Sequence, residues 1–235
     1  MRLSRRGAVR ASLAGLAGLA FSTAGSAGSA LARSTIDGDT PATPAAALRL
    51  LREGNLRWQA GEPRHPNLHT ERRSGLASAQ YPHTVVLGCA DSRVPPELVF
   101  DRGLGELFTV RSAGQVLDSA VAGSIAYAGR HLGPRLVVVL GHASCGAIAA
   151  ALEAHSHGEV PEGPIGYLVQ QLLPVVEDNA GGARDLADAC VTANARIGAE
   201  QLRDLEALQE PIARGTMEVI AARYELATGA VTFLD

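Results

Sequence analysis

The chain has 235 residues, with 21 basic and 24 acidic side chains and a formal net charge of −3. All of the basic residues are arginines, which excludes chemistry that needs a lysine, such as Schiff-base formation or a phosphate-binding loop. Hydrophobic residues make up 46% of the chain, enough for one sizeable core, and the three cysteines are too few for a disulfide scaffold. The near-neutral balance argues against a nucleic-acid-binding surface.

The first segment has the composition of an export signal. Residues 1–36 contain no acidic side chain, and an arginine-containing start is followed by a short apolar stretch and by Ala30-Leu31-Ala32. These are the three parts of a secretory signal. The adjacent Arg5 and Arg6 resemble a twin-arginine signal, with an ordinary Sec signal as the alternative. We expect a signal peptide over residues 1–32, a linker over 33–42, one domain over 43–235, and a periplasmic or extracellular protein.

Helix and strand signals alternate along the rest of the chain. Thr43 as N-cap and Pro44 at the first helical position predict an amphipathic helix that ends near Gly61. Unalternating β-branched runs at 84–88, 107–110 and 136–140 are typical of strands buried on both faces. Helices are also predicted at 71–79, 119–132, 146–152, 166–176 and 184–208, and strands at 218–224 and 231–234. This alternation implies a single α/β domain with a mainly parallel central sheet flanked by helices. No later stretch is long enough for a membrane span.

Two of these strands end in the same way. One leads through a glycine to Cys89, and the other leads through a glycine to His142. Neighbouring parallel strands would bring both side chains to one edge of the sheet. Cys145 adds a second thiol at the start of a helix, whose dipole favours a thiolate. Two thiols and one imidazole suit zinc, and three protein ligands leave a fourth position open, as catalytic zinc sites do.

Asp91 and Arg93 follow Cys89 closely. The Asp91 carboxylate could close the fourth position on the metal, or it could pair with Arg93 and leave that position to water. Ordinary core and surface roles remain open for each of these residues, as does a Cys89–Cys145 disulfide in an exported protein. Cys190 is expected in the core. Solvated or capping roles are expected for the other six histidines: His65, His69, His83, His131, His155 and His157.

Three segments, at residues 89–97, 101–108 and 141–147, resemble the signature blocks of β-class carbonic anhydrases. The likeness extends over nearly the whole chain after the export signal. It implies a zinc enzyme that reversibly hydrates carbon dioxide to bicarbonate and a proton through a zinc-bound hydroxide. It further implies one Zn2+ per subunit, held by Cys89, His142 and Cys145. An N-terminal helical arm that wraps a partner subunit is also implied, and with it a homodimer or homotetramer.

The same resemblance implies roles for further residues. Asp91 and Arg93 would form a gating dyad, and Gln80 and Gly146 would bind substrate. A subgroup of the family has a regulatory bicarbonate pocket made by a tryptophan, an arginine and a tyrosine. Arg111 and Tyr224 match two of these residues, but Val86 replaces the tryptophan, so this pocket is not expected. Zinc hydrolases of carbonyl sulfide or carbon disulfide resemble the family too, and a non-catalytic zinc-site homologue is a further alternative.

Overall fold

The structure of the protein is a computed structural model that describes residues 40–181 and 185–234. The predicted signal peptide lies outside the described residues. In chain order the elements are α2 (Pro44–Ala60), α3 (Thr70–Gly75), β1 (Thr84–Cys89), α4 (Pro96–Val99), β2 (Leu107–Ser112), η1 (Ala113–Gln115), α5 (Ser119–His131), β3 (Leu136–His142), α6 (Gly146–His157), α7 (Gly163–Asn179), α8 (Leu186–Arg203), α9 (Glu206–Ala213), β4 (Glu218–Tyr224) and β5 (Val231–Leu234).

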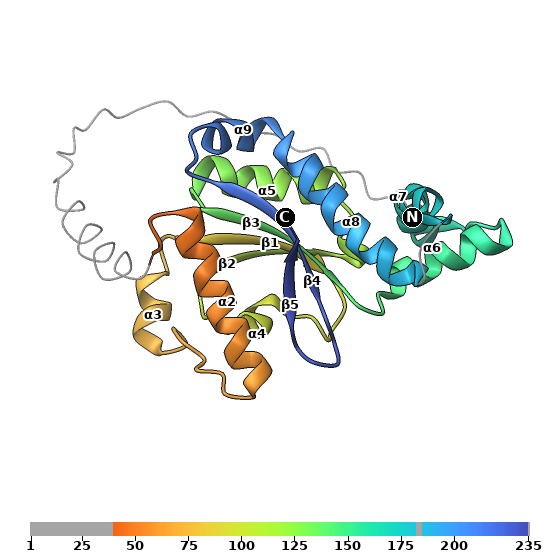
Figure 1. The fold of residues 1–235 in the computed structure, drawn as a ribbon. Helices are drawn as coiled ribbons and strands as arrows, with labels where there is room; N and C mark the ends of the chain where they lie inside the picture. The colour runs from red at the N-terminus through yellow and green to blue at the C-terminus, as the bar shows by residue number, and fades with distance from the viewer. Residues whose placement is uncertain (1–39, 182–184, 235) are drawn as a thin grey trace, which may run out of the picture. The chain divides into compact units, whose positions relative to one another are not determined.

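The five strands form one sheet in the order β2-β1-β3-β4-β5 (Figure 1). The first four are parallel, and β5 pairs antiparallel with β4. This arrangement confirms the predicted mainly parallel α/β fold. Because β1 and β3 are direct neighbours, the two strands that end at Cys89 and His142 deliver those residues to the same edge of the sheet.

Both faces of the sheet are covered by helices. Val85 and Leu87 pack with residues of α5, α8 and α9, whereas Val86 points to the opposite face and packs with α2 and α4 (Figure 1). Every residue of β1 and of β3 is buried, which accounts for the unalternating apolar runs. The same expectation for residues 107–110 was wrong, because β2 is an edge strand and none of its residues is fully buried. Each fully buried valine or leucine of this core contributes about 1.5–3 kcal/mol to folding.

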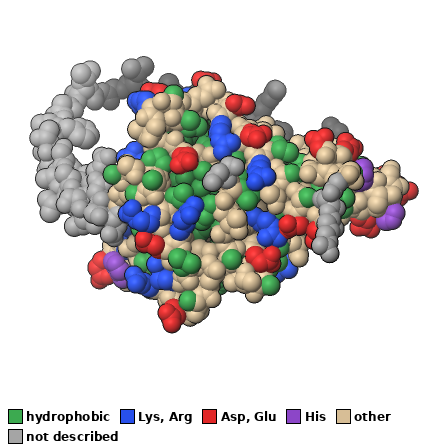
Figure 2. Space-filling view, viewed as in Figure 1, with side chains coloured by type: hydrophobic (Ala, Val, Ile, Leu, Met, Phe, Trp, Pro, Cys, Tyr) green, Lys and Arg blue, Asp and Glu red, His purple; other side chains and the backbone are tan. Residues whose placement is uncertain are grey.

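The helix that opens the domain has the predicted ends. The Thr43 side chain accepts a hydrogen bond from the Ala46 amide at 3.2 Å, and Gly61 ends the helix in the left-handed conformation with φ 72°. Within the described residues, no helix is both long and apolar enough to cross a membrane. On the face drawn in Figure 2, the arginine and acidic side chains of the described residues are interspersed rather than separated by sign.

Some predicted helix ends were wrong. α3 ends at Gly75 rather than at residue 79, and its last residue is a glycine, which is a poor helix former. The predicted helix over 184–208 is two helices, because Leu205 adopts an extended conformation between α8 and α9. The four-residue helix α4 was not predicted, since it is too short to show a helical period.

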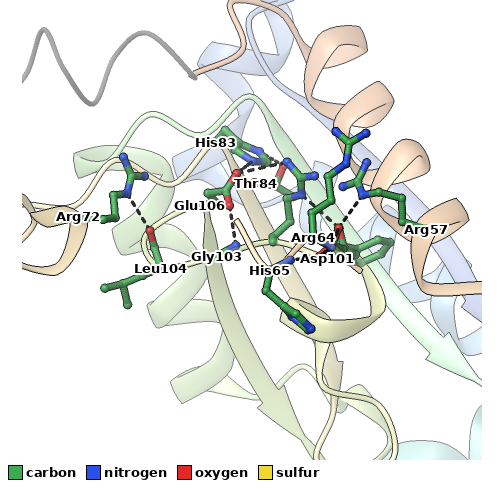
Figure 3. Close-up of polar contacts among 12 residues, drawn as sticks. Arg57, Arg64, His65, Arg72, His83, Thr84, Asp101, Gly103, Leu104 and Glu106 are labelled. Carbon is green, nitrogen blue, oxygen red and sulfur yellow. Dashed lines mark hydrogen bonds and ion pairs between the residues drawn. The ribbon is translucent and has the colours of Figure 1, made fainter. Parts of the chain in front are cut away.

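One of the six other histidines departs from its expected role. His83 is only 3% exposed, because it directly precedes a strand that is buried on both faces. Its Nδ1 lies 2.8 Å from Thr84 Oγ1, and its Nε2 lies 3.9 Å from the buried carboxylate of Glu106 (Figure 3). Burial lowers the pKa of His83 to about 4. His69 caps α3 as expected, and His65, His131, His155 and His157 are exposed.

A buried carboxylate ties α2 to the segments that follow it. Asp101 accepts hydrogen bonds from Arg57 Nε at 2.6 Å and from the backbone amides of Arg64 and His65 (Figure 3). Its side chain is fully buried, so all of its charge is balanced within the protein. Asp101 thereby fixes the loop after α2 against the end of α4.

Candidate metal centre

The three predicted metal ligands lie together where β1 and β3 end. Cys89 is the last residue of β1, His142 is the last residue of β3, and Cys145 is the N-cap of α6. One donor atom from each lies within 4.8 Å of the other two. Around a tetrahedral zinc ion with bonds of about 2.0–2.3 Å, ligand atoms are about 3.8 Å apart. The cluster is therefore close to the dimensions that zinc requires.

The imidazole of His142 is prepared to bind a metal ion. Its side chain is 0% exposed, and Nδ1 lies 2.9 Å from the Ala143 carbonyl oxygen, to which it donates. Nε2 is buried and has no hydrogen-bond partner among the described residues. A buried nitrogen without a partner is costly, and a bound metal ion satisfies it. The donor set and this orphaned nitrogen both fit zinc.

The two thiols lie close enough to affect each other's ionisation. The neighbouring Cys145 lowers the pKa of Cys89, burial opposes this, and His142 and two backbone amides lower it further. The neighbouring Cys89 and burial both raise the pKa of Cys145. The pair therefore loses its first proton more readily than a single buried thiol. All three cysteines are free, so the structure does not contain the alternative disulfide, and Cys190 lies in the core as predicted.

Asp91 is held by Arg93 beside this cluster. Arg93 donates from Nε to Asp91 Oδ1 at 2.9 Å and from an NH2 nitrogen to Oδ2 at 2.7 Å. Arg93 also donates to the Ser144 carbonyl at 3.2 Å. These hydrogen bonds hold the pKa of Asp91 well below its usual value, although burial opposes them. Of the two arrangements that the sequence leaves open, the structure has the paired one, with Oδ2 4.0 Å from His142 Nε2.

Comparison with known proteins identifies the family. The carbonic anhydrase family model matches residues 84–231. The carbonic anhydrase of Mycolicibacterium smegmatis is 43% identical over 192 residues, which cover 81% of this chain and 93% of that protein. A structure of two tetrameric β-carbonic anhydrases from Sordaria macrospora aligns with a TM-score of 0.64 and 25% identity, over 77% of this chain and 93% of that one. The chain belongs to the β-class carbonic anhydrases.

A second mycobacterial relative agrees with this assignment. Carbonic anhydrase 2 of Mycobacterium tuberculosis is 43% identical over 196 residues, which cover 82% of this chain and 93% of that protein. As a carbonic anhydrase, the protein reversibly hydrates carbon dioxide to bicarbonate and a proton. Its cysteine–histidine–cysteine cluster corresponds to one zinc ion per subunit.

The two predicted substrate-binding residues lie in different places in this carbonic anhydrase. Gly146 is exposed, directly follows Cys145, and begins α6, so its backbone N–H has no acceptor within the helix. Gln80 precedes β1, whereas Cys89 ends that strand, which separates the two ends by about 17 Å at 3.3 Å per residue. Gln80 therefore comes just before the end of β1 that is opposite to the predicted ligand Cys89.

Arg111 has a structural role that the sequence analysis missed. Its Nε donates to the Cys89 carbonyl at 2.8 Å, and its NH2 donates to the Asp91 carbonyl, so it fixes the turn between the two residues. The parallel register of β1 and β2, which pairs Gly88 with Arg111, creates these contacts. Tyr224 instead accepts a hydrogen bond from Trp58 Nε1 at 3.0 Å, and Val86 is fully buried in the core.

Proposed function

We propose that Cys89, His142 and Cys145 hold the zinc ion of this carbonic anhydrase, and that Asp91 and Arg93 control the fourth position. The observation that carries this proposal is the cluster itself, with three donor atoms within 4.8 Å and the paired Asp91 carboxylate beside them. A bound zinc ion would act as a Lewis acid and lower the pKa of a coordinated water to about 7, the value known for carbonic anhydrases with three histidine ligands.

The protein's own residues orient the reaction. The ionised Asp91 carboxylate only accepts hydrogen bonds, so it would orient the reacting water by accepting a hydrogen bond from its O–H group. Arg93 keeps the carboxylate available for this task, because its planar fork fixes both carboxylate oxygens. The Gly146 amide, at the start of α6, is a donor for an oxygen of carbon dioxide or bicarbonate.

Metal analysis and stopped-flow assays of the full chain test this function. Cys89→Ser and His142→Ala should each lose both zinc and carbon dioxide hydration. Retention of stoichiometric zinc by either variant contradicts the ligand assignment. Turnover on carbon dioxide, carbonyl sulfide and carbon disulfide should be compared in the same preparation, because a higher rate on a sulfur-containing gas would favour the related hydrolase activity.

We further propose a homodimer, or a tetramer built from dimers. Two observations support it: a Sordaria macrospora β-carbonic anhydrase is described as tetrameric, and β2 is an edge strand of the sheet. If Gln80 contacts substrate, it does so at the cluster of a second protomer, since its own cluster lies at the far end of β1. Light scattering coupled to size-exclusion chromatography should give the mass of two or four chains, and a monomer would contradict the proposal.

The export route is proposed from composition. Arg5 and Arg6 precede a short apolar stretch, which supports transport to the periplasm or beyond by the twin-arginine route. Because that route carries folded proteins, zinc could bind Cys89 and Cys145 before their thiols meet an oxidising compartment. Changing Arg5 and Arg6 together to Gln should abolish export. Unchanged export would favour the Sec route.

A further inference from the structure

The sulfur of Cys89 is approached by the backbone of a neighbouring turn. The Gly114 amide donates to Cys89 Sγ at 3.3 Å, and the Asp91 amide donates to it at 3.4 Å. The Asp91 amide lies two residues from Cys89, so local geometry fixes it. Gly114 lies 25 residues away, in the 3-10 turn η1 that follows β2. Its contact with the sulfur therefore depends on how η1 is held.

The turn has an unfavourable backbone conformation. Gly114 has φ 64°, and Gln115, which has a β-carbon, follows with φ 45°. Residues other than glycine rarely adopt a positive φ, and they keep this conformation only where surrounding contacts fix it. A β-carbon at Gly114 would lie 3.0 Å from atoms of Ala147 and Leu172, so the turn is also closely packed against α6 and α7.

One side chain from a distant helix holds this turn. Asn194 Nδ2 donates to the Gly114 carbonyl oxygen at 2.9 Å, across 80 residues of sequence. Asn194 lies on α8, whose Ala195 and Ala199 are fully buried against the sheet, so the amide is presented from a rigid support. The carbonyl that Asn194 binds and the amide that reaches the sulfur belong to the same residue. The two groups lie on either side of the Gly114 Cα, so holding the carbonyl restricts the rotations of this closely packed residue that would turn its N–H away from the sulfur.

We propose that Asn194 is a positioning residue for the zinc ligand Cys89. It acts through Gly114, by aiming the Gly114 N–H at the sulfur. Groups that hydrogen-bond to a metal ligand set its orientation and its electron donation, and their loss typically weakens metal binding by about 10–100-fold. This inference rests on the proposed role of Cys89 as a zinc ligand.

The helix that bears Asn194 also provides a matched control. Asn194 and Gln201 both lie on α8 and both line a cavity of about 480 Å3 between η1, α7 and α8. The structure records no hydrogen bond from Gln201 to the turn among the residues it describes, and Gln201 is exposed. Gln201→Ala therefore removes an amide from the same cavity without touching the Cys89–Gly114 contact.

The test uses the full chain and two readouts other than activity. The first is the rate of zinc loss to an excess of chelator, and the second is the thiolate-to-metal charge-transfer band of the cobalt-substituted protein. Asn194→Ala and the isosteric Asn194→Asp, which cannot donate to a carbonyl, should both lose zinc about tenfold faster. Both should shift the band to lower energy, because a thiolate that loses an N–H donor gives more charge to the metal. Gln201→Ala should match the wild type in both readouts.

The outcomes separate this inference from the proposed function. If wild-type protein with cobalt has no thiolate charge-transfer band, Cys89 is not a ligand and the proposed function fails. If the wild type has the band but both Asn194 variants keep its energy and the wild-type rate of zinc loss, the positioning role is overturned. Should Asn194→Ala fail to fold, Asn194→Asp, which preserves the shape of the side chain, gives the decisive comparison.

Discussion

Arg93 donates a hydrogen bond to each carboxylate oxygen of Asp91, at 2.9 and 2.7 Å, beside the three proposed metal ligands. In the proposed function, this pair decides between two states of the site. While the fork holds, the carboxylate stays off the fourth position. Without it, the carboxylate is free to turn toward the zinc ion, because Oδ2 already lies 4.0 Å from the ligand nitrogen of His142.

The first prediction concerns that pair. Arg93→Ala should lower turnover by about 100-fold, the cost typical of misplacing a reacting group by about 1 Å, while zinc content stays stoichiometric. Stopped-flow hydration assays and metal analysis measure the two quantities. Arg130→Ala, which breaks an exposed ion pair with Glu206, is the control and should keep wild-type turnover. An Arg93→Ala enzyme with full turnover would exclude the gating role.

Zinc removal should destabilise the domain. Without the metal, Nε2 of His142 is a buried nitrogen with no partner among the described residues. The two buried thiols also lose the positive charge that would stabilise their thiolates. Stripping zinc with a chelator should lower the Tm measured by calorimetry, and adding zinc back should restore it. His142→Ala should show no such difference, and a metal-dependent Tm in that variant would contradict the prediction.

Protonation of His83 should lower the stability of the domain at acid pH. Its pKa is about 4 in the folded protein because of burial, and about 6.5 when unfolded. Between these values the unfolded chain binds more protons, so stability is lost as pH falls from about 6.5 to 4, by about 3 kcal/mol in total. His83→Asn, which retains a polar partner for Thr84 but does not titrate, should have a shallower pH dependence in urea unfolding over this window. Identical slopes for the two proteins would refute the prediction.

Removing the carboxylate charge of Asp101, which holds the loop after α2, should lower the stability of the fold more than it affects zinc binding. Asp101→Asn leaves Arg57 without its charged partner and should cost about 2–3 kcal/mol in urea unfolding. Because the side-chain hydrogen bonds of Asp101 go to Arg57, Arg64 and His65 and to none of the proposed ligands, the zinc content of the folded variant should not change. Glu206→Gln, at an exposed pair, should cost less than about 1 kcal/mol and provides the comparison. Loss of zinc from folded Asp101→Asn would contradict this separation.

The sequence predicted those parts of the fold that depend on neighbouring residues. Thr43 and Gly61 mark the ends of α2 because capping is local, and the apolar runs mark β1 and β3 because both faces of those strands are buried. The convergence of Cys89 with His142 also followed from a general property of parallel strands. For the helix ends and the strands a short stretch of chain contained the necessary information, whereas the convergence also required β1 and β3 to be neighbours, which the structure shows.

Contacts between distant segments were not predictable in this way. Arg111 and Asn194 support the metal cluster only because of the pairing of β1 with β2 and the packing of α8 beside η1. His83 was wrongly expected to be solvated or to cap a helix, since its burial depends on helices that cover both faces of the sheet. A single sequence contains no local signal for any of these three environments.

The exposure of the cluster is uneven. Cys89, Cys145 and His142 are at most 5% exposed, whereas the Arg93 side chain is 53% exposed. A small molecule that approaches from bulk water thus meets the guanidinium first. An oxyanion that binds the guanidinium there competes with the Asp91 carboxylate for the same hydrogen-bond donors.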